Sequence, residues 1–144
     1  MTGNLVNFVA FQIGWWCSVV GAGRGWMFLG PAVVAAVVIL HLVRSSEPKR
    51  EAKFLAAVAF VGTVVDSLFA ASGLLAYQGG YGVPWIAPAW ITGMWLNFGT
   101  TIHASMGWLK GRPILAAVFG AVGGPLTYKA GASLGAAELL HPQW

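Results

Sequence analysis

The chain has 144 residues, of which 58% are hydrophobic and only 8% are charged. Because soluble domains carry about 25% charged residues, this composition excludes an ordinary water-facing surface and predicts an integral membrane protein. The net charge of +4 does not indicate a nucleic-acid binder, since the basic residues cluster in short connections between apolar segments. The single cysteine, Cys17, excludes an intramolecular disulfide and a cysteine metal cluster. We therefore predict one membrane domain, residues 1–144, without a separate soluble domain.

Five apolar segments are long enough to cross a bilayer core of roughly 30 Å, which requires about 20 residues per helix. They cover residues 5–22, 26–43, 54–77, 88–109 and 114–134. The connections between them are short and rich in glycine, proline and charge, as turns require. The fold class is therefore predicted to be an all-α bundle of five transmembrane helices. The first segment lacks a basic leader and a cleavage motif, so we expect it to remain as a helix rather than be removed as a signal peptide.

The distribution of basic residues predicts how the bundle is oriented. The second and fourth connections contain Arg44, Lys49, Arg50, Lys53, Lys110 and Arg112. The first connection contains only Arg24, and the third contains no basic residue. The positive-inside rule places the second and fourth connections in the cytoplasm. The N-terminus is then cytoplasmic, and the C-terminus lies across the membrane.

Asp66 is the most informative polar residue, because an acid near the middle of an apolar segment costs a few kcal/mol or more. At 1.5 Å per residue, Asp66 and Asn97 lie at a similar depth, roughly 18 to 19 Å above the cytoplasmic boundary. Gln12 and His103 form a shallower level, about 10 Å deep. Thr63 shares the small, polar face of Asp66, so we expect the third and fourth helices to pack through Asp66 and Asn97. Such residues serve packing and ligand binding equally well, and both interpretations stay open.

Lys129 is a candidate counter-charge for Asp66, but its angular position argues against the pair. Small residues including Gly120 form a ridge on the fifth segment that permits close helix packing. Lys129 lies about 180° from Gly120, so its long side chain more readily reaches the outer interface. Without the ion pair, desolvation favours a neutral, protonatable Asp66, with hydrogen bonds from Asn97 or Thr63 holding the carboxyl group.

The histidines are not expected to form a metal site. His41 lies near the cytoplasmic end of the second segment and His141 in the opposite tail, so we do not expect them to converge with His103 on one metal ion. A lone His103 more often joins neighbouring helices than catalyses, and Ser105 beside it has no obvious acid to complete a triad. The Gly–Gly–Pro sequence at residues 123–125 predicts a kink, or alternatively a broken helix of the kind that holds ions in transporters. We therefore predict no metal and no cofactor.

Several short motifs spread along the chain resemble those of a domain-of-unknown-function family of small bacterial inner-membrane proteins. They are N-F-V-A-F-Q-I-G-W at 7–15, V-D-S-L at 65–68, W-L-N-F-G-T-T-I-H-A-S at 95–105, G-R-P at 111–113 and G-G-P-L-T-Y-K-A-G at 123–131. The resemblance implies a multi-pass protein of the bacterial inner (cytoplasmic) membrane. Members of that family are often encoded near enzymes resembling cyclopropane-fatty-acyl methyltransferases, which implies a role and an enzyme partner in lipid modification. The resemblance carries over no catalytic residue, but its motifs include Asn7, Gln12, Asp66, Asn97 and His103.

We therefore expect a buried polar pocket that binds a membrane lipid or another amphipathic ligand and acts in fatty-acyl or phospholipid modification. Asp66 and Asn97 would hold its polar group. Trp95, Trp15 and Trp16 are candidate linings of an acyl path, although packing and interfacial anchoring explain the last two more readily. Two alternatives stay open: a small transporter that uses Asp66 as a proton or ion site, and a structural subunit of a larger membrane complex. Whether the protein is an enzyme, and its oligomeric state, are not predicted.

Overall fold

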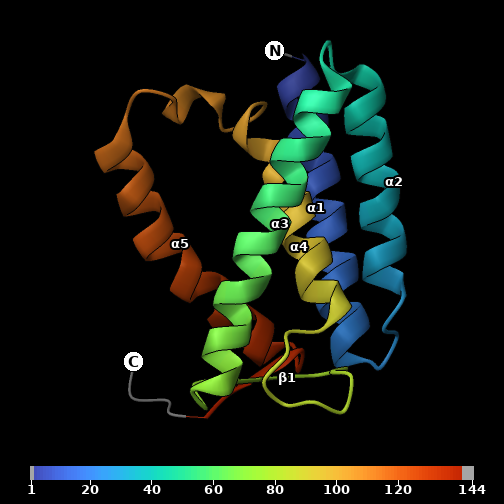
Figure 1. The fold of residues 1–144 in the computed structure, drawn as a ribbon, viewed down its shortest axis with the longest axis vertical. Coiled ribbons are helices and arrows are strands. Elements are labelled where there is room, and N and C mark those ends of the chain that lie inside the picture. The colour runs from blue at the N-terminus through green and yellow to red at the C-terminus, as the bar shows by residue number, and fades with distance from the viewer. Residues whose placement is uncertain (1, 141–144) are drawn as a thin grey trace.

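The computed structural model describes residues 2–140 and is built from α-helices, as Figure 1 shows. The helices are α1 (Thr2–Gly23), α2 (Leu29–Arg44), α3 (Pro48–Ala71), α4 (Ala89–Ile102) and α5 (Pro113–Ser133). A short 3₁₀ helix, η1 (Gly107–Leu109), precedes α5. Two strands of three residues each, β1 (Leu75–Tyr77) and β2 (Ala137–Leu139), pair antiparallel. The predicted all-α class is thus confirmed, with one small strand pair that the apolar pattern did not indicate.

The structure corrects the ends of the third predicted segment. Helix α3 begins at Pro48, because proline suits the first helical position, where its missing N–H costs nothing. It ends at Ala71 because Gly73, at φ 73°, reverses the chain. The backbone N–H groups of Gly73 and Leu74 then bond the carbonyls of Ala70 and Phe69, which is the Schellman arrangement. The last residues of the predicted span therefore form β1 instead of helix.

The fourth predicted segment is also shorter than expected, because α4 ends at Ile102 instead of continuing to residue 109. The Asn7 side chain of α1 donates to the carbonyl of Thr100 at 3.0 Å and accepts from the Ser105 hydroxyl at 2.8 Å. One amide thereby satisfies a backbone carbonyl in the last turn of α4 and a hydroxyl beyond its end, which stabilises the chain reversal there. His103 consequently lies at the C-cap of α4 rather than inside a helix.

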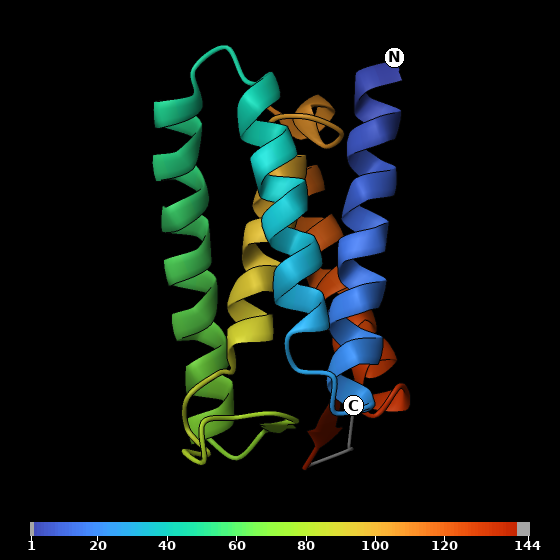
Figure 2. The same cartoon turned by 90° about the vertical axis from the view of Figure 1, so that its right-hand side faces the viewer.

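Helices α1 to α4 form the bundle, with α4 in contact with α1, α2 and α3 (Figure 2). The predicted contact between the third and fourth helices is confirmed. Glycines permit the close approaches: a Cβ at Gly30 would lie 2.5 Å from the Cα of Ser18, and one at Gly62 would overlap the indole of Trp95. A buried cluster that includes Val19 and Trp90 fills the end of the bundle near the strands.

Helix α5 lies apart from the bundle over much of its length (Figure 1). It runs without a break through Pro125, so the broken-helix alternative does not describe this structure. A Cβ at Gly120 or Gly124 would meet no other heavy atom within 4 Å. The part of the predicted packing ridge at Gly120 and Gly124 therefore makes no close contact with another described helix, because the α4–α5 connection carries the chain away from α4 before α5 begins. Beyond the other end of α5 the chain does approach the bundle, since a Cβ at Gly23 would overlap the carbonyl oxygen of Leu134.

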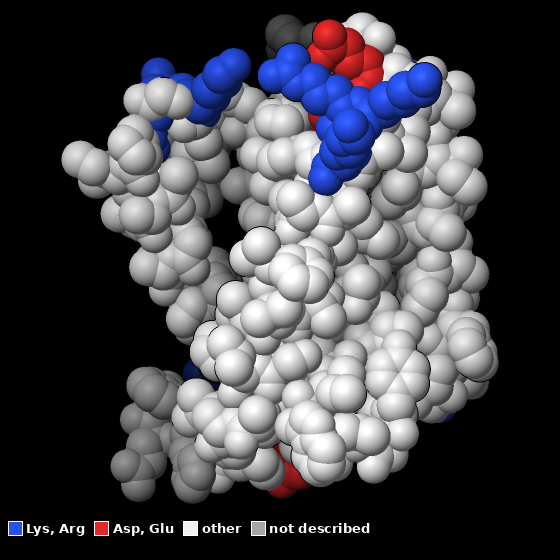
Figure 3. All heavy atoms as spheres, viewed as in Figure 1, with Lys and Arg blue, Asp and Glu red and all other residues white. Residues whose placement is uncertain are grey.

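Basic side chains gather at one end of the molecule. The α2–α3 and α4–α5 connections lie at one end in Figure 1, and in Figure 3 Lys and Arg gather there above an almost uncharged belt.

Two helices, at Gly3–Gly23 and Pro48–Ala71, are long and apolar enough to cross a membrane, while α2 is apolar but has 16 residues. Helix α4, with 14 residues, reaches only about 21 Å. Of the five predicted spans, two therefore correspond to described helices whose length and composition suffice to cross a membrane.

Candidate functional site

The first polar centre is the Asp66 cluster, which consists of Asp66, Tyr77, Trp95 and Tyr128. Asp66 is only 2% exposed. Its Oδ1 accepts hydrogen bonds from the hydroxyls of Tyr77 and of Tyr128, the latter at 2.6 Å. Its Oδ2 accepts from the indole N–H of Trp95 at 2.5 Å. One carboxyl group therefore joins α3 to β1, α4 and α5.

These partners differ from the predicted ones. The Asn97 amide donates instead to the carbonyl of Phe11 at 2.9 Å, and Thr63 bonds Thr92 at 2.9 Å. Asn97 faces α1 because Gly14 lets the two helices approach closely. The Oδ1 atom of Asn97 is buried there without a hydrogen-bond partner among residues 2–140.

The predicted counter-charge is also absent from the cluster. Lys129 is exposed, and among the described residues it forms no ion pair with Asp66. Tyr128, one residue earlier, occupies the place beside the carboxyl group. Three donors converge on the carboxyl oxygens of Asp66, so this group holds α3, β1, α4 and α5 together.

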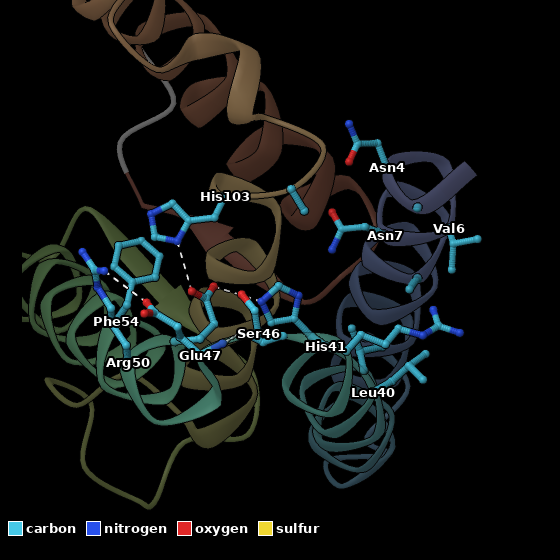
Figure 4. Close-up of a pocket in the computed structure, with 17 residues that line it drawn as sticks. Asn4, Val6, Asn7, Leu40, His41, Ser46, Glu47, Arg50, Phe54 and His103 are labelled. Carbon is cyan, nitrogen blue, oxygen red and sulfur yellow. Dashed lines mark hydrogen bonds and ion pairs between the residues drawn. The ribbon is translucent and has the colours of Figure 1, made fainter. Parts of the chain in front are cut away.

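The second polar centre is a cavity of about 800 Å³ at the basic end of the molecule, between α1, α2, α3 and the end of α4 (Figure 4). We call it the Glu51 cavity. Its polar lining includes Asn4, Asn7, His41, Arg44, Glu47, Arg50, Glu51 and His103. Its apolar lining includes Val6, Ala10, Val37, Leu40 and Phe54. The cavity therefore offers both a charged region and a hydrocarbon region to one ligand.

Glu51 holds a histidine on each of its carboxylate oxygens. Its Oε1 lies 3.0 Å from Nε2 of His41, and its Oε2 lies 3.2 Å from Nδ1 of His103. The ring of Phe54 stacks on the imidazole of His103, with 4.2 Å between the centroids. Burial opposes ionisation of Glu51, but the hydrogen bonds and charges of the two histidines outweigh it and lower the pKa of this carboxyl, which precedes the apolar part of α3.

His41 and His103 lie close to one acid, a neighbourhood that the sequence did not indicate. Their rings take opposite oxygens of one carboxylate, so they meet through Glu51 rather than at a common point. Within residues 2–140, no group of three or more His, Cys, Asp and Glu side chains is arranged to hold a metal ion. The third histidine, His141, lies outside the described residues.

Only two of the predicted site residues, Asn7 and His103, line the Glu51 cavity. Gln12 is half-buried on α1 and is not part of the lining. Trp15 packs against the buried cluster near the strands, and Trp16 is 51% exposed with its ring edge-on to Trp15. The predicted aromatic acyl path is therefore not assembled around this cavity.

Sequence reasoning missed His41 and Glu51 as members of the site. Glu51 belongs to a charged connection whose residues usually face water, and its two histidine partners are 10 and 52 residues away in the chain. No spacing signal connects residues so far apart. The only available hint was that His41 and Glu51 flank the same short turn between two apolar segments.

A family model described as "Protein of unknown function (DUF2878)" matches residues 4–144. The chain belongs to the DUF2878 family. This membership confirms the family-level part of the resemblance seen in the sequence motifs. No curated protein and no solved structure matches this DUF2878 protein.

Proposed function

We propose that this DUF2878 protein is a multi-pass protein of the bacterial inner membrane whose Glu51 cavity binds a lipid or another amphipathic ligand. The observation that carries the proposal is the mixed lining of the cavity. Polar side chains of Asn7, His41, Glu51 and His103 stand beside the apolar side chains of the same wall. A headgroup would occupy the charged region and an alkyl chain the apolar region, where it loses contact with water.

Exposed apolar surface supports the membrane location. Large hydrophobic side chains cover the outside of the helices; Phe60 is 72% exposed and Ile114 is 81% exposed. Monomeric soluble proteins rarely expose contiguous apolar surface on this scale, whereas lipid chains would cover it at no cost. The basic connections at one end would then face the cytoplasm, according to the positive-inside rule. All five α-helices would cross or enter the membrane, with the end of β2 on the opposite side.

A role in fatty-acyl or phospholipid modification, as an enzyme or as the accessory of one, fits such a ligand. It rests on the family resemblance. The transporter alternative is less well supported, because Asp66 does not line the Glu51 cavity and already accepts hydrogen bonds from Tyr77, Trp95 and Tyr128. An ion or proton passing through this site would have to displace those donors. The structural-subunit alternative has one supporting feature, the uncovered face of α5.

The test is native mass spectrometry of the protein purified in a mild non-ionic detergent, followed by lipidomics of what it retains. Two matched variants place a tryptophan on α1. Val6 lines the cavity and is 44% exposed, whereas Val9 is 47% exposed and lies outside the lining. Val6→Trp is expected to abolish retention of the ligand, while Val9→Trp leaves it unchanged. If no ligand is retained by the wild type, or if both variants retain it equally, the proposal is wrong.

Orientation is tested separately with an impermeant thiol reagent on intact cells. Ser46 lies in the α2–α3 connection and Gly80 in the loop between β1 and α4. In a Cys17→Ala background, Gly80→Cys is expected to react and Ser46→Cys to stay protected until the cells are broken. The reverse pattern would invert the proposed topology.

A further inference from the structure

One arginine in the lining of the Glu51 cavity forms no ion pair with an acid of the described chain. Glu47 pairs with Arg50 at 3.1 Å, and Glu51 bonds His41 and His103. Arg44 also lines the cavity, yet it forms no ion pair with any described residue. A guanidinium is always charged and presents several N–H donors, which suit the oxygens of a phosphate or carboxylate.

His41 stands beside Arg44, three residues earlier on α2, so both side chains lie on one face of the helix. Glu51 occupies only the Nε2 atom of His41, and Nδ1 has no partner among the described residues. When the ring is protonated, both of its nitrogens donate, so Nδ1–H becomes a second donor next to the guanidinium. In Figure 4, His41 extends into the cavity, facing the side of α1 that carries Asn7.

We propose that the Glu51 cavity selects ligands with an oxyanion headgroup, a phosphate monoester or a carboxylate, which Arg44 and the protonated His41 bind. This inference rests on the proposed function and names the ligand class for the same cavity. The alkyl chain of the ligand lies against Val37 and Leu40, on the same helix as the two cationic groups. Glu51 acts as a positioning residue, because it orients His41 and stabilises the protonated ring without itself touching the ligand.

The other charged groups around His41 determine the sign of the net charge of the cavity lining. Helix α3 contributes Arg50 and Glu51, the connection before it contributes Glu47, and the end of α4 contributes His103, while α1 contributes only the neutral Asn4 and Asn7. Two arginines and two glutamates balance, so each histidine that becomes protonated gives the lining a net positive charge. Protonation of His41 should therefore favour a bound oxyanion.

The decisive measurement is titration of the purified protein, in a non-ionic detergent, with dodecyl phosphate, with dodecyl maltoside and with inorganic phosphate, followed by native mass spectrometry. Arg44→Gln removes the unpaired cation. Lys49→Gln is the matched control, since Lys49 is equally exposed at the same end but does not line the cavity. Loss of a charge-assisted hydrogen bond should weaken dodecyl phosphate binding by about tenfold or more in Arg44→Gln, and by less than about twofold in Lys49→Gln.

A second variant, His41→Gln, isolates the histidine. A phosphate monoester binds its second proton at about pH 6, so the measured quantity is the ratio of wild-type to His41→Gln affinity for dodecyl phosphate, in which the protonation of the ligand cancels. This ratio should be at least about threefold larger at about pH 6 than at pH 8. An equal ratio at both pH values would overturn the role given to this histidine.

The outcomes separate the inference from the proposed function. Equal binding of dodecyl phosphate and dodecyl maltoside, or equal losses in Arg44→Gln and Lys49→Gln, would overturn the oxyanion inference and leave the amphiphile cavity standing. Binding of inorganic phosphate as tight as that of dodecyl phosphate, with the same dependence on Arg44, would support the oxyanion site and refute the amphiphile. Binding of none of the three compounds would refute both.

Discussion

Replacing Asp66 by alanine tests whether this acid is structural. The change leaves two tyrosine hydroxyls and the indole N–H of Trp95 without their acceptor. A buried donor that loses its acceptor costs about 1 to 3 kcal/mol, which gives an upper sum of roughly 3 to 9 kcal/mol for the three donors. The hydroxyls of Tyr77 and Tyr128 share one oxygen and are able to reorient towards each other, whereas the indole N–H is not. We therefore expect Asp66→Ala to lower the free energy of unfolding by about 3 to 5 kcal/mol.

The assay is equilibrium unfolding in mixed micelles, followed by the fluorescence of the eight tryptophans. Asp66→Asn is the matched variant, because it keeps one carbonyl oxygen as an acceptor and should cost only about 1 to 3 kcal/mol. Wild-type stability of Asp66→Ala would refute the structural role. Loss of a proton-coupled flux in a fully stable Asp66→Asn would revive the transporter alternative.

Three further predictions follow from other contacts. Asn7→Ala should lower the free energy of unfolding by about 1 to 3 kcal/mol and speed amide exchange at the end of α4, because Ser105 and a backbone carbonyl lose their partner; unchanged exchange there would contradict this. Gly30→Ala should lower the melting temperature because its Cβ would overlap the backbone of α1, whereas Gly120→Ala, which points into open space, should leave it unchanged or raise it; a dissociated oligomer in Gly120→Ala would show instead that a partner packs on α5. Because the pKa of Glu51 is lowered, ionised Glu51 stabilises the fold above its ordinary pKa of 4.5, and this contribution is lost as the pH falls through the lowered pKa. The difference in melting temperature between wild type and Glu51→Gln should therefore shrink below pH 4.5.

The helices were predictable because apolar segments and turn residues mark them directly. The start of α3 at Pro48 and its end before Gly73 follow from local rules that hold for any helix. The early end of α4 was not predictable in this way. It depends on Asn7, which is more than ninety residues away in the chain and caps α4 only once α1 lies beside it.

The importance of Asp66 was predictable from its cost in an apolar segment, but its partners were not. Periodicity assigned Asn97 to the face of α4 that meets α3. In the structure, Gly62 makes room for the Trp95 indole on that side, and Asn97 turns to α1. A glycine opposite a tryptophan is a packing relation between two helices, and single-helix patterns carry no information about it.

The Glu51 cavity was the least predictable feature, because it forms where four helix ends meet. His103 was singled out from its position, and Asn7 from the motif that contains it. The acid that connects His103 to His41 lies in the first turn of α3, in a charged part of the sequence whose side chains usually face water. Only the three-dimensional arrangement distinguishes Glu51 from its charged neighbours.

The pairing of β1 with β2 has a consequence for the order in which the protein assembles. Residues 75–77 leave the ribosome about sixty residues before their partners at 137–139. Until then, Asp66 also lacks Tyr128, so its carboxyl group has only the donors from β1 and α4. Because chains are made from the N-terminus, the four-helix bundle is able to pack first, and α5 is fastened to it last. Truncation before β2 should therefore leave a folded four-helix bundle with a loosened fifth helix, because α5 keeps the hydrogen bond of Tyr128 to Asp66 but loses the strand pair that fastens its end.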